Sequence, residues 1–412
     1  MKVWVKLLIG SILGVVLTFI LPKDAPFFAT KIIETAHDIA LNIGRYTTIP
    51  LLFFGLTISI YKLRSLGKFW PLIARTFFVM IAASVLVISI GVAVTFIFPP
   101  ERVPIVMEEQ MEITPLKAEF FLLNLFPSNM LSVFTAERLF VFPLMICAFF
   151  MAIGLTYDNH FSKSIINLVD SFSRIFFHIT AFFSEILGVV IIVISAYWAI
   201  QYRNAIDQGP FKAIILLLLI FSLVLGLLIL PAMLYLFGNK KQNPWVVLYG
   251  SLAPAISSFF SGDINFSLPV LLYSTKNNLG IKRCSSSITV TLFSTFGRSG
   301  SSMVATVALI VIIKSYSSLG MSINDVAGII VSALLLTFLL GQHSGNAAFV
   351  CLASLCAAYG NGFNNGYLIL KPIAFFLVAL GTFLDVMIAA FGSFVVASLS
   401  GLQENRIVKH FV

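Results

Sequence analysis

The sequence predicts an all-α polytopic membrane protein. Of its 412 residues, 59% are hydrophobic and only 10% are charged, and the mean hydropathy is +1.01. A soluble protein of this length could not cover so much apolar surface with so few charges. Apolar runs of about 20 residues, the length with which a helix crosses a bilayer, recur along the whole chain. The formal net charge of +9 does not indicate nucleic-acid binding, because most Lys and Arg residues flank these runs and orient them in the membrane.

The first half of the chain is expected to form single spans. No convincing cleavage site follows the apolar run at 3–21, so this run is expected to be retained as a helix and not removed as a signal peptide. The segment 120–155 is too long for one straight span and is interrupted at Pro127, so two or three helical pieces are expected there. Further single spans are expected at 43–68, with Pro50 inside it, and at 73–98, 164–200 and 211–237.

Charged residues predict how these spans are oriented. The acidic segment 101–119, with Glu101, Glu108, Glu109, Glu112 and Glu119, is expected to be a solvated loop outside the cell. On the fifth span, Asp170, Arg174 and Glu185 are expected to form structural ion pairs. The charge asymmetry predicts a multi-pass protein of the cytoplasmic membrane with both termini in the cytoplasm. The basic ends that carry this prediction are Lys62, Arg64, Lys68, Lys163, Lys240, Lys241, Lys276, Lys282, Arg283, Arg406 and Lys409.

Two apolar segments in the second half are interrupted by polar residues. The segment 245–280 is cut at 261–263 and the segment 326–358 is cut at 341–346, so each arm is expected to be too short to cross alone. Broken helices with polar tips mark substrate sites in secondary transporters, because half-helix ends offer partial charge and free backbone groups at mid-membrane. A full span is expected after each broken segment, which suggests an internal repeat, at 285–314 and 366–398.

Three motifs along the chain carry a likeness to a known family. IPLLFFGLTISIYKLRSLGK (49–68) looks like a second helix, FPSNML (126–131) like the entry to a fourth, and NPWVVLYGSLAPAISSFFSGDINFSLPV (243–270) like a first re-entrant hairpin. Together with Asp385 in the last helix, they resemble the dicarboxylate/amino acid:cation symporter family, which includes glutamate and C4-dicarboxylate transporters. The likeness covers essentially the whole chain.

The resemblance implies a secondary active transporter with eight transmembrane helices and two re-entrant hairpins. Residues 1–240 would form mainly the scaffold, while the third helix would belong to a transport domain that moves as an elevator inside a homotrimer. The solute would be a small organic molecule, an amino acid or a dicarboxylate. The rest of the transport domain would lie in residues 241–412, with hairpin one at 245–280, helix seven at 285–314, hairpin two at 326–358 and helix eight at 366–398.

Several positions depart from the family's pattern. Where the family has Asn-Met-Asp-Gly-Thr in its seventh helix, this chain has Gly297-Arg298-Ser299-Gly300-Ser301. The family's substrate-binding arginine falls on Ile388, and an asparagine and an aspartate beyond it fall on Gly392 and Val396. Lost oxygen ligands and lost negative charge predict weak or absent sodium dependence, with H⁺, another ion or no ion in place of Na⁺. Cation-coupling roles are still assigned to Gly297, Ser299, Ser301 and His343.

Arg298 and Asp385 are the principal candidate site residues. A charge at the centre of a bilayer costs about 3 kcal/mol or more, so it needs a partner, water or a ligand. Arg298 could clamp a substrate carboxylate with its planar fork, or act as a tethered cation in the space of the family's sodium ion. Asp385 could hold a substrate ammonium or form a permanent ion pair with Arg298. Around Arg298, helical spacing predicts a small, polar face that points into the protein, formed by Ser294, Gly297 and Ser301.

The two polar tips supply further candidates. Asp263 could cap the returning helix or contact the substrate as a counter-charge. His343 could carry a proton, because histidine side chains ordinarily titrate near physiological pH, or be a neutral, water-facing side chain. The remaining candidate substrate ligands, each of which could instead satisfy local backbone groups, are Asn265, Ser267, Gln342 and Ser344.

Other function classes are weighed against the carrier. The chain has no His/Glu metal motif, nucleophile elbow or aspartyl pair, so no enzyme, metal centre or cofactor is expected. The alternatives to a sodium symporter are a sodium-independent or proton-coupled carrier, a uniporter or channel, and a non-transporting sensor on the same fold.

Overall fold

The computed structural model is all-helical in the residues that it describes. These are 2–20, 27–100, 102–103, 113–135, 140–157, 162–206, 211–237, 243–316, 321–360, 362–404 and 411. Within them, seven segments are long and apolar enough to cross a membrane, and the only extended pairings are two isolated β-bridges. The predicted all-α polytopic membrane protein is therefore confirmed. The number of eight spans stays a prediction, because the apolar helices near 3–19 and 141–157 fall just short of that length.

The first half differs from the predicted division into helices in two respects, because a helix that was not expected covers Phe27–Arg45 and the second predicted span is interrupted. The segment 120–155 forms three helical pieces, and the second predicted span is broken at Tyr46-Thr47. Pro50 consequently lies in the first turn of a helix and not inside a span, where its missing N–H would disrupt a hydrogen bond. The elements are α1 (Val3–Ile20), α2 (Phe27–Arg45), α3 (Thr48–Ser65), α4 (Phe69–Ile97), α5 (Ala118–Leu123), α6 (Ser132–Thr135), α7 (Val141–Tyr157), α8 (Lys163–Ile206), α9 (Lys212–Val224), the π-helical turn η2 (Leu225–Ile229) and α10 (Leu230–Phe237).

The second half contains both predicted interruptions. Gly262, with φ of 60°, ends one helix, and Asn346, with φ of 56°, precedes another. Glycine and asparagine tolerate this left-handed conformation better than other residues. The elements are α11 (Pro244–Gly250), α12 (Leu252–Ser261), α13 (Ile264–Asn277), α14 (Arg283–Phe296), α15 (Ser299–Tyr316), α16 (Ile323–Leu339), the 3₁₀ turn η3 (Leu340–Gln342), α17 (Ala347–Tyr359), the 3₁₀ helix η4 (Gly366–Ile373) and α18 (Ala374–Leu399).

Two predictions for this half are wrong. The expected single helix over 285–314 is two helices, because the chain breaks at Gly297-Arg298 between α14 and α15. The helical face predicted around Arg298 is therefore not continuous. In addition, the segment Ile323–Gln342 has 20 residues and a mean hydropathy of 2.1, so the first arm of the second broken segment is long enough to cross a membrane alone.

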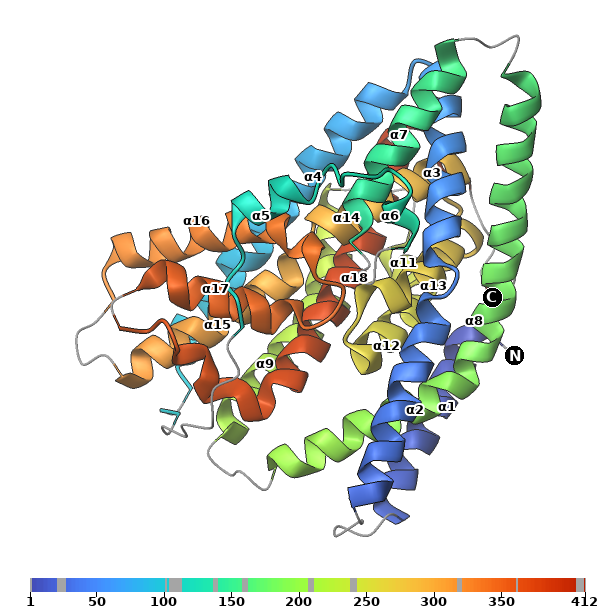
Figure 1. Cartoon of the computed structure of the whole chain (residues 1–412). Coiled ribbons are helices and arrows are strands. Elements are labelled where there is room, and N and C mark those ends of the chain that lie inside the picture. Colours follow the sequence, from blue (N-terminus) through green and yellow to red (C-terminus); the bar gives the residue numbers. More distant parts are fainter. Residues whose placement is uncertain are drawn as a thin grey trace.

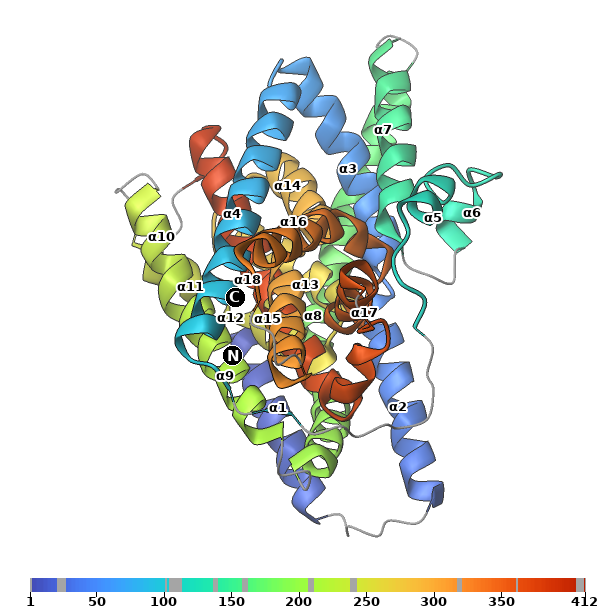
Figure 2. The same ribbon diagram turned by 90° about the vertical axis from the view of Figure 1, so that its left-hand side faces the viewer.

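Helices α14 and α15 are enclosed by the rest of the chain. The apolar window within Arg283–Tyr316 is 100% buried, whereas only 28% of the window within Ile323–Gln342 is buried. Helices α4, α16 and α18 all pack against α15 (Figure 1), and Figure 2 shows α15 and α18 near the middle of the molecule. The polar residues at the break between α14 and α15 thus face protein and not lipid, as predicted for the surroundings of Arg298.

Ion pairs join the early helices to one another and to α14. Asp170 on α8 accepts hydrogen bonds from three cationic side chains, so its carboxylate is fully compensated. Several residues used to predict the topology lie outside the described residues, namely Glu101, Glu108, Glu109, Glu112, Lys240, Lys241, Arg406 and Lys409. The expected structural pairs are confirmed, with Asp170 bound to Lys62, Arg174 and Arg283, and Glu185 bound to Lys6.

Candidate functional site

The two predicted polar tips lie against each other. We call residues 261–263, between α12 and α13, the first tip, and residues 340–346, between α16 and α17, the second tip. The backbone N–H of Ile264 donates to the carbonyl of Ser344 at 3.1 Å, and Asp263 and Gly345 form an isolated antiparallel bridge. The sequence separates these tips by about 80 residues, and the fold brings their backbones into one site.

Asp385 is placed by the close packing of α18 on α15. A Cβ atom at Gly300 would lie 2.4 Å from Cβ of Leu384, and one at Gly381 would lie 2.9 Å from Cα of Ser301, so only glycine permits this approach. Oδ1 of Asp385 accepts from the backbone N–H of Ser301 at 2.9 Å, and Oδ2 accepts from its hydroxyl at 2.6 Å. The carboxylate therefore lies at the N-terminus of α15, where unpaired N–H groups and the helix dipole stabilise negative charge.

Arg298 lies in the break between α14 and α15 and is completely buried. Its Nε donates to Oδ2 of Asp385 at 3.2 Å. Its Nη1 donates to the carbonyl of Leu340 at 3.3 Å and to the carbonyl of His343. One guanidinium thus joins α18 to the second tip. A buried arginine is stable only with such partners, because leaving either charge unpaired in the interior is costly.

Three side-chain atoms at the α14–α15 break and the second tip have no hydrogen-bond partner among the described residues. They are buried and belong to side chains that the sequence assigned to the site: Nη2 of Arg298, Oγ of Ser299 and Nε2 of Gln342. Buried polar groups are nearly always hydrogen-bonded. The described residues therefore leave the hydrogen-bonding capacity of these three atoms unused.

A cavity of about 180 Å³ lies beside the second tip, which contributes Gln342 and His343 to its wall. That volume is below the roughly 300 Å³ typical of pockets for drug-sized ligands, and neither Arg298 nor Asp385 lines this cavity. The rest of the wall comes from α5, α6, α7 and the residues next to them, namely Phe120, Asn124, Pro127, Ser132, Val133, Phe140 and Pro143.

At the first tip, both oxygens of Asp263 are engaged. Oδ1 accepts from the backbone N–H of Phe266 at 2.8 Å, which confirms the predicted N-cap of α13. Oδ2 accepts from Nη2 of Arg45 at 2.5 Å. The hydroxyl of Ser267 donates to the carbonyls of Asp263 and Ile264, so it satisfies local backbone.

The remaining candidates join the site through their backbones. His343 and Ser344 each offer a carbonyl, to Arg298 and to Ile264 respectively. The carbonyl of Asn265 accepts from the hydroxyl of Thr48 at 3.1 Å. Gly297 ends α14, and a Cβ there would lie 2.9 Å from Phe293, so this position has a packing role.

The comparison of the whole sequence with protein families decides the class of this protein. The Sodium:dicarboxylate symporter family matches over residues 3–399. The chain belongs to this family. It is consequently a membrane transporter that works in a lipid bilayer on a small-molecule substrate. Its family is one of transporters and not of enzymes. The comparison with curated proteins found no match.

Sequence reasoning about this symporter-family chain missed Arg45. No role was predicted for it, although it stands between two apolar stretches shortly before Pro50. The rule applied to Arg298, that an isolated charge within a span needs a partner, would have singled it out. Nothing in the sequence, however, indicates that its partner is Asp263, 218 residues away.

Proposed function

We propose that this protein is a secondary carrier of a small neutral or zwitterionic solute, and that its transport does not require sodium. The observation that carries the proposal is the position of Arg298. Its guanidinium is surrounded by the carboxylate of Asp385 and the carbonyls of Leu340 and His343. Carboxylate and carbonyl oxygens are the ligands that hard cations prefer. In this protein, the positive charge of Arg298 already contacts these oxygen atoms.

The charges around the tips support a solute without excess negative charge. The buried side chains Arg298 and Asp385 form one ion pair, and Arg45 and Asp263 form another. Arg298 and Arg45 each already have a carboxylate partner, so neither guanidinium adds an uncompensated positive charge for a dicarboxylate. Nη2 of Arg298 still lacks a partner, so it can donate to a single carboxylate or carbonyl group of the solute.

Arg298 also disfavours a sodium ion in the same place. Two positive charges within a few ångströms repel each other strongly at the low effective dielectric of a protein interior. A sodium ion would also have to share Asp385 with the guanidinium. We therefore propose that a proton, or no ion at all, is coupled to transport.

The proposal also includes a domain arrangement. Residues 241–412 would move with α4 as a transport domain against a scaffold formed mainly by residues 1–240, in a homotrimer of the cytoplasmic membrane with both termini in the cytoplasm. The packing of α4 supports its assignment, because a Cβ at Gly91 would lie 2.5 Å from Cγ of Met303 on α15. Such close contact favours movement of the two helices together.

A thermal-shift experiment on the purified protein tests the solute class. We expect neutral amino acids such as alanine and serine to raise the unfolding temperature, equally in sodium chloride and in choline chloride. Succinate and malate should not raise it. A solute at 100 times its Kd stabilises the folded state by about 2.7 kcal/mol.

Two further results complete this test. Gln342→Leu should leave the unfolding temperature without solute near that of the wild type, because Nε2 has no partner to lose, and should abolish the solute's effect. Counterflow in vesicles should then show trans-stimulation, which a channel lacks. Stabilisation by succinate and malate, with none by neutral amino acids, would contradict the proposed solute class.

A further inference from the structure

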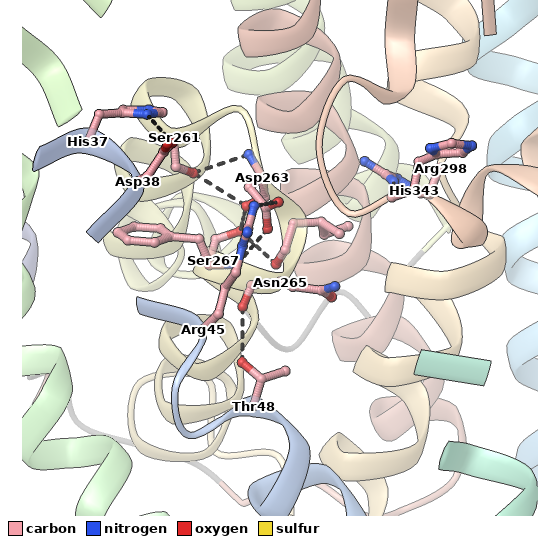
Figure 3. A network of polar contacts seen from close by, with 12 residues as sticks. His37, Asp38, Arg45, Thr48, Ser261, Asp263, Asn265, Ser267, Arg298 and His343 are labelled. Carbon is pink, nitrogen blue, oxygen red and sulfur yellow. Dashed lines mark hydrogen bonds and ion pairs between the residues drawn. The ribbon is translucent and has the colours of Figure 1, made fainter. Parts of the chain in front are cut away.

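The break between α2 and α3 lies directly against the start of α13. Figure 3 shows Arg45 and Thr48, on either side of that break, facing Asp263 at the first tip and Asn265 in the first turn of α13. Arg45 donates to Asp263 at 2.5 Å, and Thr48 donates to the carbonyl of Asn265 at 3.1 Å. The break in the second predicted span thus supplies two polar contacts to a segment more than 200 residues further along the chain.

Packing at this contact leaves no spare room. A Cβ atom at Gly44 would lie 2.0 Å from the ring of Phe266, which is fully buried. Glycine at the end of α2 therefore allows the aromatic ring to fill the space beside Arg45. Two contacts fix the position of the ion pair. They are the packing of Gly44 against the Phe266 ring and the hydrogen bond from Thr48 to the carbonyl of Asn265.

The two charged side chains of this contact differ in their exposure to solvent. The side chain of Asp263 is only 2% exposed, whereas that of Arg45 is 24% exposed. If the two separate, Arg45 has access to water, but Asp263 becomes a buried charge without a cation. Its bond to the backbone N–H of Phe266 compensates only part of that charge. Opening this contact is thus costly unless Asp263 also changes its surroundings.

We propose that Arg45 is a positioning residue that holds the first tip against the second, and that the Arg45–Asp263 ion pair opens in each transport cycle. This inference rests on the proposed function, in which residues 241–412 move against the early helices. Arg45 belongs to the early helices and Asp263 to the moving part. The pair therefore stabilises one position of the transport domain over the others. The second tip is coupled to it, because Ile264, next to Asp263, donates to Ser344.

Among the described residues, a second ion pair between the two parts of the chain differs from this one in one respect. Asp170 on α8 binds Arg283 on α14, but it also binds Lys62 and Arg174. When Arg283 moves away, two cations remain on Asp170. Separation of that pair leaves no uncompensated charge, so Arg283→Ala is a matched control for the loss of Arg45.

The experiment measures opening of the tips without any solute. A cysteine is introduced as Ser344→Cys in the purified full-length protein, and its rate of labelling by a water-soluble maleimide is measured above the background of the native cysteines. The variants Arg45→Gln, Asp263→Asn and their combination are compared, since asparagine still caps a helix but carries no charge. Thermal unfolding of each variant confirms that it is folded.

We expect each single variant to raise the labelling rate on the order of tenfold, and the combination to raise it no further, because the two residues act as one unit. Arg45→Lys should lie between the wild type and Arg45→Gln, since lysine keeps the charge but not the planar fork. Arg283→Ala should be labelled at the wild-type rate.

Three outcomes would overturn the inference: an unchanged rate in Arg45→Gln, single effects that multiply in the combination, or an equal increase in Arg283→Ala. Since the assay needs no transported solute, its result stands apart from the test of the proposed function. Failure to find a transported solute would leave the labelling result intact, and a failed labelling result would leave the solute class untouched.

Discussion

Arg298→Ala is expected to lower the free energy of unfolding by about 3–5 kcal/mol, because it leaves the carboxylate of Asp385 buried without its cation. The exposed fraction of Asp385 is only 1%, and among the described residues Ser301 alone would remain as its hydrogen-bond donor. The second tip would also lose the contacts that Leu340 and His343 make with the guanidinium. Thermal and denaturant unfolding of the purified protein measure this loss.

The same variant should gain a response to sodium. Without the guanidinium, Asp385 and the carbonyls of Leu340 and His343 present oxygen atoms and one uncompensated negative charge to the space that Arg298 filled. Such a set suits a hard cation. Sodium chloride, compared with choline chloride, should therefore raise the unfolding temperature of Arg298→Ala.

Two proteins serve as controls for the sodium response. Neither the wild type nor Arg298→Lys should respond, since each keeps a fixed positive charge at this position. A sodium response of all three proteins, or of none, would show that Arg298 does not stand in the place of a cation.

Gly300→Ala is expected to have the second large effect. The added Cβ would lie 2.4 Å from Cβ of Leu384 and 2.7 Å from the backbone nitrogen of Asp385. Backbone cannot move aside as a flexible side chain can, so α15 and α18 must separate, at a cost of about 1–3 kcal/mol or more. The separation would also draw Asp385 away from Ser301, so solute stabilisation should be lost as well.

Gly328→Ala is the matched control for this substitution. Gly328 lies in α16, and a Cβ there meets nothing within 4 Å. Alanine at a helical position without a clash should stabilise the protein by about 0.4–1 kcal/mol. If both variants unfold at the same temperature, the tight packing of α15 on α18 is not what positions Asp385.

The sequence predicts those parts of the fold that depend on local patterns. Apolar runs mark the spans, and polar interruptions with Gly262 and Asn346 mark where helices end, because these residues adopt the left-handed conformation that the turns require. The break at Gly297 is not predicted, since a glycine within an apolar run is compatible with a continuous helix. The break instead accompanies the contacts that Arg298 makes with Asp385 and with the second tip, which are distant in the sequence.

The sequence indicates which charges in the membrane need a partner, but it does not indicate which partner each one has. An ion pair between Arg298 and Asp385 was one of two alternatives that the cost of a charge in the membrane leaves open, and the structure shows it. The structure brings the two tips together, but the contacts of His343 and Ser344 there use backbone carbonyls, which side-chain chemistry does not indicate. The Arg45–Asp263 pair depends on how α2 and α13 pack, and this contact cannot be predicted from a single sequence.

The most direct test of the account is transport in proteoliposomes with sodium replaced by choline, at fixed pH and membrane voltage, using a solute identified by thermal shift. We expect the initial rate of uptake to be the same in both salts, because the positive charge of Arg298 already fills the site among Asp385, Leu340 and His343. Uptake that collapses in choline and returns with sodium would contradict the account.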